Sequence, residues 1–249
     1  MAGEWQELLE RVRRLNKAVS RLAGFQPDYA GIMLELAGEL GGCLAAVVKA
    51  DGEVLAVAPE EDRFFLEGLP QFTREQLNLV DEPRKEAVGG EWGLPKQYAV
   101  LCPIVGGGER VGTLVLNHDR KLTDAEQFLA EYSAAFFGVL MTRSRASQLE
   151  DKVRQRTACQ VALSSLSFSE QQAIHRILHE LDGFEGMIVT SKIAEAAGIT
   201  RSIVVNGLRK LESAGLIESR SLGMKGTYIR VLNEYLSDAL ADALGKKSG

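Results

Sequence analysis

The chain has 249 residues, of which 45% are hydrophobic and 25% charged, and its formal net charge is −5. This length and composition predict two folded domains and exclude a wholly disordered chain. Charged residues interrupt every long apolar run, so no membrane span is expected, and the charged N-terminus lacks the apolar stretch of a signal peptide.

The cysteines and the charge pattern narrow the class further. Cys43, Cys102 and Cys159 are far apart without a CxxC pair, which favours a reducing, cytoplasmic location over disulfides or a zinc finger. Residues 184–232 carry seven basic and four acidic side chains, a net charge of +3, which leaves −8 for the other 200 residues. A net acidic chain argues against a nucleic-acid partner, but a basic segment within it favours one.

The first 70 residues predict two helices, a hairpin and a short helix. Apolar residues at helical spacing indicate one amphipathic helix up to Leu22 and a second between Pro27 and Gly41. Two β-rich runs flank Asp51-Gly52, a pair that tolerates positive φ in a tight turn. A short helix carrying Phe64 follows, and residues 71–97, with two prolines and three glycines, are interpreted as an irregular functional loop.

Residues 98–117 predict two more strands. The segment 106–110, Gly-Gly-Gly-Glu-Arg, joins them. A phosphate loop would lead into a helix and contain Gly-Lys-Ser/Thr, so a hairpin loop is the favoured interpretation. The order of elements indicates an α+β domain, an antiparallel sheet with helices packed on it.

A long helix is expected next. Thr123 to Glu126 has the Ser/Thr-x-x-Glu form of a capping box, and the helical pattern extends to about Leu166. Residues 143–156 are charged on all sides, which is typical of a solvated connector. The predicted organisation is therefore an N-terminal domain at 1–138, a helical linker at 139–166 and a C-terminal domain at 167–249.

The C-terminal domain predicts a winged helix-turn-helix. A helix capped by Ser169 is followed by helices at 191–197 and 200–213 and by strands at 217–222 and 227–232. Ala194 and Val204 have the small and branched side chains that a tight helix crossing needs, and Gly198 suits a turn with positive φ.

Several side chains of this domain are of the types that contact DNA. Arginine pairs with guanine, asparagine pairs with adenine, and short hydroxyls and lysines bind phosphate. The expected contacts from the second helix and the wing are Thr200, Arg201, Ser202, Val205, Asn206, Arg209, Lys210, Arg220, Ser221 and Lys225. The alternative is a winged helix that contacts only protein.

In the N-terminal domain, Arg63 lies beside Phe64 and Phe65, with Phe72 nearby. These residues could form an apolar pocket with one cation for a carboxylate, or a core helix with a surface arginine. The histidine pair His175 and His179 has i, i+4 spacing but no accompanying HExxH glutamate, so a solvated or capping role is favoured over a metal site. Because no nucleophile–base or paired-carboxylate pattern is found, the chain is not expected to be an enzyme.

Four stretches together resemble the CodY family of nutrient-sensing repressors. They are CPIVGGGERVGTLVL from Cys102, VALSSLSFSE from Val161, ELDGFEGMIVTSKIA from Glu180 and ITRSIVVNGLRKLESAGLIESRSLGMKGTY from Ile199. The similarity is very specific from Val161 onward, good over 103–138 and loose before about Gly90.

The resemblance implies a GAF sensor domain, a long linking helix and a winged helix in a homodimer that binds AT-rich, near-palindromic operators. It implies a branched-chain amino acid as effector, with GTP as a second one, and no metal or prosthetic group. Carried over by position, the DNA-reading segment is 190–209 and the wing is 219–226, which adds to the expected contacts Thr190, Ser191, Lys192, Ala194 and Ser219. The family's pocket arginine and phenylalanine correspond to Arg63 and Phe72, with Phe64 beside them.

The chain departs from the family pattern near both effectors. A proline and a tyrosine that close the family pocket are replaced by Thr73 and Gln76, and small residues replace a Phe-Pro segment near 86–90. The basic run of the first hairpin becomes Lys-Ala-Asp-Gly-Glu at 49–53, where the two acids would repel a triphosphate. Leu140 occupies the acidic position that could bind guanine, with Arg145 nearby.

Two other function classes stay open at this point. One is a GAF-containing, nucleotide-responsive enzyme with an accessory winged helix, and the other is a protein-binding scaffold. The enzyme would need a catalytic base and a phosphate loop. The scaffold differs from a repressor in that it would not bind DNA even at low salt.

Overall fold

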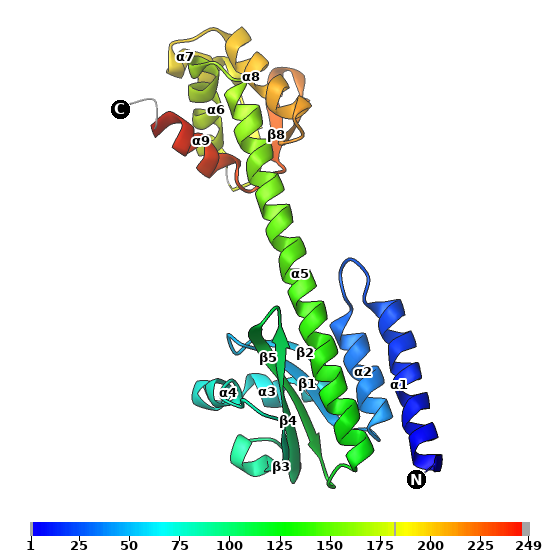
Figure 1. Ribbon diagram of the computed structural model, residues 1–249. Coiled ribbons are helices and arrows are strands. Elements are labelled where there is room, and N and C mark those ends of the chain that lie inside the picture. Colours follow the sequence, from blue (N-terminus) through cyan, green and yellow to red (C-terminus); the bar gives the residue numbers. More distant parts are fainter. Residues whose placement is uncertain (1, 182, 246–249) are drawn as a thin grey trace. The chain divides into compact units, whose positions relative to one another are not determined.

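The computed structural model describes residues 2–181 and 183–245 and divides into two compact units, Met1–Ser147 and Gln148–Gly249 (Figure 1). Helix α5 (Asp124–Ser164) contributes to both. None of the described helices is sufficiently long and apolar to cross a membrane.

The first unit is built on a five-stranded antiparallel sheet with strand order β2-β1-β5-β4-β3. Its strands are β1 (Leu44–Lys49), β2 (Val54–Ala58), β3 (Arg84–Val88), β4 (Tyr98–Gly106) and β5 (Glu109–His118). Its helices are α1 (Ala2–Leu22), α2 (Tyr29–Glu39), α3 (Arg63–Glu67), α4 (Gln71–Leu77), the first part of α5, and the short 3₁₀ helices η1 (Glu60–Asp62) and η2 (Gly89–Trp92).

Helices cover both faces of this sheet, as Figure 1 shows. Alternate residues of the central strands point to opposite faces. Ala45 and Val47 of β1 pack with α1, α2 and α5 in one core, whereas Leu44 and Ala46 pack with α3, α4 and η2 in another. Burial on both sides explains why these strands are continuously apolar rather than alternating.

The predicted hairpins and capping box are confirmed. The β1–β2 turn contains Gly52 with φ +86°, and the β4–β5 turn contains Gly107 and Gly108, also at positive φ. At the start of α5 the amide of Glu126 donates to Thr123 Oγ1 at 3.3 Å, and the amide of Thr123 donates to Glu126 Oε2 at 2.9 Å.

The prediction of an irregular loop over 71–97 is wrong. This stretch forms α4, β3 and η2. Strand β3 is an edge strand, paired only with β4, and its sequence RKEAV is almost entirely exposed. An exposed edge strand lacks the alternation of apolar and polar residues from which strands are predicted.

In its described residues, the second unit contains the end of α5, four further α-helices, one 3₁₀ helix (η3) and a three-stranded sheet in the order β6-β8-β7. The elements are α6 (Phe168–Glu180), β6 (Glu185–Ile188), α7 (Thr190–Ala197), α8 (Arg201–Ser213), β7 (Ile217–Ser221), η3 (Gly223–Lys225), β8 (Thr227–Val231) and α9 (Leu236–Gly245). Cys159 and Leu163, near the end of α5, are buried in its core.

Three local features of this unit differ from the sequence prediction. The cap of α6 is Ser167 rather than Ser169, because Ser167 forms a complete capping box with Glu170, whose carboxylate is a stronger acceptor than the amide of Gln172. Strand β6 was not predicted, since its four residues are too few to show a period. Helix α9 was not predicted either.

Candidate nucleic-acid interface and sensor site

Helices α7 and α8 form the crossing that the sequence predicted. Ala194 and Val204 are buried between them, and Gly198 ends α7 in the left-handed conformation with φ +66°. The amide of Ile199 donates to the Ala194 carbonyl at 3.0 Å, which closes the turn. Because Ala194 is buried in the crossing, its role here is to bring the two helices close together.

The N-terminal half of α8 presents polar side chains to solvent. Thr200, Arg201, Ser202 and Asn206 are exposed, and Val205 is half-buried. Thr200 is the N-cap residue, but its side chain makes no capping hydrogen bond. The structure therefore brings together the residue types predicted to read DNA.

The start of α7 is fixed to the start of α8 by one hydrogen bond. Arg201 Nε donates to the buried Thr190 Oγ1 at 3.2 Å. This bond uses the Nε–H of the Arg201 guanidinium, leaves its two terminal nitrogens for other partners, and occupies the Thr190 hydroxyl. The neighbouring Ser191 and Lys192 are exposed.

Lys210 and Arg209 have different surroundings although they are adjacent on α8. Arg209 is exposed, whereas Lys210 Nζ lies 2.8 Å from Glu170 Oε2 and donates to the Ser165 carbonyl at 3.0 Å. Burial alone would raise the pKa of Glu170, but hydrogen bonds from Lys210 and Ser167 outweigh it and lower that pKa. Lys210 therefore ties α8 to the turn between α5 and α6.

The wing carries Arg220, Ser221 and Lys225, all exposed. Ser219 is half-buried, and both its amide and its hydroxyl donate to Glu212 Oε1 at 3.0 Å. Ser219 thus joins the base of the wing to α8, while the tip of the wing holds the solvated cations.

In the first unit, Arg63 is engaged with carboxylates of its own chain. Its Nε lies 2.5 Å from Glu60 Oε1, its Nη1 lies 3.5 Å from Glu67 Oε1, and Nη1 donates to the Val54 carbonyl at 3.2 Å. The hydrogen bond that Arg63 donates to Glu60 is the largest cause of the raised pKa of Arg63. Phe64 is 62% exposed, and its ring contacts that of Phe65. The side chain of Phe72 lies outside the described residues, although its backbone is part of α4.

A cleft of about 270 Å³ lies between α4, β3 and η2. Gln76, Leu79, Arg84, Glu91 and Trp92 line it, and the Arg84 guanidinium lies 5.7 Å from the centre of the Trp92 ring. Sequence reasoning missed most of this set because the whole stretch was interpreted as a loop. Only Gln76 had a signal, through its replacement of the family tyrosine.

Comparison with known proteins decides the family. A model described as the CodY helix-turn-helix domain matches residues 184–243, and one described as the CodY GAF-like domain matches residues 71–165. The Global transcriptional regulator CodY of Anoxybacillus flavithermus is 40% identical over 249 aligned positions, which cover 91% of this chain and 95% of the relative. The chain belongs to the CodY family.

A second curated CodY regulator gives the same result. The regulator of Clostridium perfringens is 39% identical over 256 positions, with 94% of this chain and 97% of the relative covered. A solved structure of the cofactor-binding GAF domain of the nutrient sensor CodY from Clostridium difficile aligns with 54% of this chain and 97% of its own, at 24% identity and a TM-score of 0.41. The curated relatives are named as transcriptional regulators and not as enzymes.

The positions that the resemblance relates to a nucleotide are occupied here by Lys49, Leu140 and Arg145. Lys49, the one cation of the first hairpin, pairs with Glu53 and lies 3.4 Å from Asp51. Leu140 is buried in the core, and Arg145 lies 3.9 Å from Glu109. The Lys49 ammonium is thus already neutralised by its own hairpin, and Leu140 does not reach solvent.

The described residues include further reactive side chains, among them three buried cysteines and a histidine pair. No three His, Cys, Asp or Glu residues among them are arranged to hold a metal ion. Burial raises the pKa of Cys43 and of Cys102 to about 12, so both thiols stay protonated at neutral pH. The rings of His175 and His179 lie edge to face, with 4.5 Å between their centroids. Burial is the main cause of the lowered pKa of His175.

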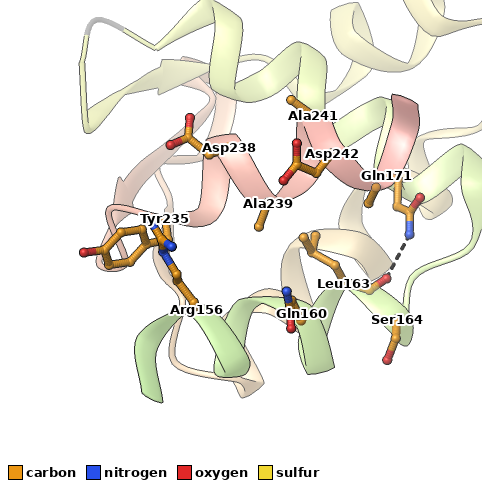
Figure 2. A pocket seen from close by; sticks show the side chains of 11 residues that line it. Arg156, Gln160, Leu163, Ser164, Gln171, Tyr235, Asp238, Ala239, Ala241 and Asp242 are labelled. Atoms are coloured by element: carbon orange, nitrogen blue, oxygen red, sulfur yellow. Dashed lines mark hydrogen bonds between the residues drawn. The ribbon is translucent and has the colours of Figure 1, made fainter. Parts of the chain in front are cut away.

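The second unit also contains a groove of about 930 Å³, shown in Figure 2. Asp238 and Asp242 of α9 line one side, and Gln160 of α5 lies opposite them. At one end the Arg156 guanidinium lies 4.9 Å from the centre of the Tyr235 ring. This groove was not predicted from the sequence, because α9 was not predicted.

Proposed function

We propose that this chain is a transcriptional repressor whose affinity for operator DNA is raised by a small molecule bound in its GAF domain. The observation that carries the proposal is the exposed cluster of Arg201, Ser202 and Asn206 at the start of α8. It lies within the segment whose net charge is +3 in an otherwise acidic chain. Membership of the CodY family supports the same conclusion.

Each element of the winged helix has a role in this proposal. Arg201 and Asn206 read base edges in the major groove, where arginine and asparagine make bidentate pairs. The free N-cap of α8 places backbone amides toward a phosphate. Lys192, Arg209, Arg220 and Lys225 contact further phosphates, whereas Lys210 is already paired with Glu170.

The proposed operator is AT-rich and near-palindromic, which requires a homodimer whose two α8 helices reach two half-sites. Exposed apolar side chains on α1 and α5 support a dimer contact in the first unit. Trp5, Phe128 and Val139 are 70%, 51% and 65% exposed. Such side chains gathered on neighbouring helices favour a protein interface. Sedimentation velocity of the wild type and of Phe128→Asp tests this part, since a monomeric wild type contradicts it.

The proposed effector is a branched-chain amino acid similar to isoleucine, bound near Arg63, Phe64 and Phe72. Its carboxylate would replace Glu60 or Glu67 as a partner of the Arg63 guanidinium. GTP is a weaker candidate, because Asp51 and Glu53 lie beside Lys49 and would repel its phosphates.

DNA binding is tested by fluorescence anisotropy with an AT-rich duplex over a range of salt concentrations. Arg201→Ala with Lys225→Ala is expected to weaken binding by about 100-fold and to reduce the salt slope by roughly one per lost phosphate contact. The matched control is Lys152→Ala with Arg176→Ala, which removes two exposed cations of the same unit outside the interface. Equal affinities and slopes for the two double variants would contradict the assignment.

The effector is tested by calorimetry with isoleucine, leucine, valine and GTP, each followed by titration with the duplex. Isoleucine is expected to bind the wild type, to tighten DNA binding and to lose its affinity for Arg63→Ala. If none of the four compounds binds, the effector scheme is wrong. Turnover of GTP by the pure protein would instead favour a nucleotide-responsive enzyme.

A further inference from the structure

Arg110, the second residue of β5, gathers acceptors from a distant segment. Its Nη1 donates to the Val80 carbonyl, and its Nη2 donates to the Leu77 carbonyl at 2.9 Å and to Thr113 Oγ1 at 2.8 Å. Thr113 Oγ1 donates to the same Leu77 carbonyl at 2.9 Å. The guanidinium therefore holds the last residue of α4 and the chain that follows it against the sheet.

Placing the Arg110 guanidinium here costs desolvation free energy that a purely structural link would not need. Among the described residues no carboxylate lies within ion-pair distance of Arg110, and its Nε is buried without an acceptor. Burial lowers the pKa of Arg110 despite the charge of Asp81. A partly buried guanidinium that binds only neutral acceptors contributes little net stability, because its desolvation offsets the hydrogen bonds.

The β4–β5 turn, next to which Arg110 pairs with Val105, lies directly on α5, as Figure 1 shows for β4, β5 and α5. A Cβ on Gly106 would come within 2.2 Å of Thr142 Oγ1 and 2.3 Å of the Gly138 carbonyl. A Cβ on Gly138 would come within 2.0 Å of the Val105 carbonyl. With backbone against backbone and no flexible side chain between them, a displacement of the hairpin must displace α5.

The segment held by Arg110 belongs to the proposed sensor site. Helix α4 carries Phe72 and Gln76, and its end is also held to the first hairpin, where Asn78 Nδ2 donates to the Ala50 carbonyl at 2.7 Å. The Oδ1 atom of Asn78, like Nε of Arg110, is buried without a partner in the described chain. An incompletely satisfied contact is one that can be exchanged at modest cost.

We propose that Arg110 is a positioning residue that couples the end of α4 to helix α5 and thereby transmits effector binding toward the DNA-binding unit. The inference rests on the proposed function, since it concerns the same GAF site. It adds a physical connection that runs from α4 through the β4–β5 hairpin to the Gly138–Thr142 turn of α5, entirely within the first unit.

The test measures coupling in the full-length protein with isoleucine as the probe. Operator affinity is determined with and without saturating isoleucine, and isoleucine affinity with and without operator. The two ratios must agree, because coupling between two sites is reciprocal. Couplings of this kind are typically about 5- to 150-fold.

Arg110→Gln is expected to bind isoleucine and to bind the operator as the effector-free wild type does, but to show a coupling ratio close to one. Arg110→Lys should retain part of the coupling, since an ammonium lacks the planar fork that reaches two carbonyls. The matched control is Arg21→Gln, an exposed arginine of the same unit that pairs with Glu35 of α2 and not with the hairpin, and it should keep the wild-type ratio. Amide hydrogen exchange at 138–142 should respond to isoleucine in the wild type and not in Arg110→Gln.

Several results would overturn the inference. One is a wild-type coupling ratio in Arg110→Gln, and another is loss of isoleucine binding by a folded Arg110→Gln, which would place Arg110 in the binding site. If Arg110→Gln does not fold, Arg110→Lys and Thr113→Val decide by the same ratio. A wild type that shows no coupling to isoleucine contradicts the proposed effector scheme itself, before any variant is compared.

Discussion

The two units differ in how completely their buried polar side chains are hydrogen-bonded. In the described chain, the buried side-chain atoms without a hydrogen-bond partner all belong to the first unit: Asn78 Oδ1, Arg110 Nε, His118 Nε2, Gln127 Oε1 and Thr142 Oγ1. In the second unit, the buried Glu170, Gln171 and Thr190 each have partners. Unsatisfied buried groups reduce stability and mark places where an alternative arrangement can compete. The comparison therefore indicates a first unit suited to changing its internal contacts and a second unit suited to presenting exposed side chains on a fixed frame.

The largest change in stability is expected when alanine replaces one of two buried helical glycines, one in each unit. Gly138→Ala should destabilise the first unit by about 2 to 3 kcal/mol, because the new Cβ has no room against the Val105 carbonyl. Gly207→Ala in α8 should instead be neutral or stabilise the second unit by up to about 1 kcal/mol, since its Cβ would lie 3.4 Å from Ile174 and alanine favours a helix.

Urea unfolding followed by tryptophan fluorescence measures the first unit alone, because Trp5 and Trp92 are the only tryptophans of the chain. Amide exchange in α6 and α8 measures the second. Equal destabilisation by Gly138→Ala and Gly207→Ala would contradict the expectation that only the helix of the first unit lacks room for an added Cβ.

The next effect is a pH dependence of the first unit. Burial, followed by the charge of Arg120, lowers the pKa of His118 from 6.5 to about 4, while Lys96 acts in the same direction and Glu126 and Asp119 oppose it. The folded unit therefore binds fewer protons than the unfolded chain. Its stability is complete above pH 6.5 and should fall by about 2 kcal/mol as the pH drops toward 4.

His118→Gln should remove this slope, and the exposed His179→Gln should not. Tryptophan fluorescence in urea between pH 7 and pH 4 is the measurement. Glu126, whose pKa is lowered to about 2 mainly by the hydrogen bond from Arg120, acts only below about pH 4.5, so the two contributions separate. An unchanged slope in His118→Gln would show that another group titrates.

A third comparison uses the adjacent cations of α8. Lys210→Met should destabilise the second unit by about 1 to 2 kcal/mol, because the side chain of Glu170, only 8% exposed, loses its counter-charge. Arg209→Met should leave stability unchanged and reduce the salt slope of operator binding by roughly one. If instead Lys210→Met changes the slope without changing amide exchange, Lys210 binds phosphate as the sequence suggested.

The smallest effect concerns the turn of the helix-turn-helix. Gly198→Ala meets no atoms within 4 Å, so only its left-handed backbone opposes the change, and the cost should be about 1 kcal/mol. A loss much larger than this, measured by amide exchange in α7, would mean that the second unit is as crowded as the first.

The sequence alone determined the elements with local signals. The two hairpins, the Thr123 capping box and the helix-turn-helix crossing each depend on residues a few positions apart, and all were predicted. The motifs from Cys102 onward also identified the family. Strand β3 and helix α4 were missed, since an exposed edge strand and a seven-residue helix carry too little periodicity.

Only the tertiary structure decided which side chains are free and which are engaged. Lys210 and Arg209 are equivalent basic residues in the sequence, yet Lys210 meets the Ser165 carbonyl across 45 positions. Arg63 is paired with two acids. Arg110, which the sequence assigned to a hairpin loop, donates to carbonyls 30 and 33 residues away. The physical reason is that charge and hydrogen-bonding capacity belong to a residue, whereas their use depends on which acceptors packing brings within about 3 Å.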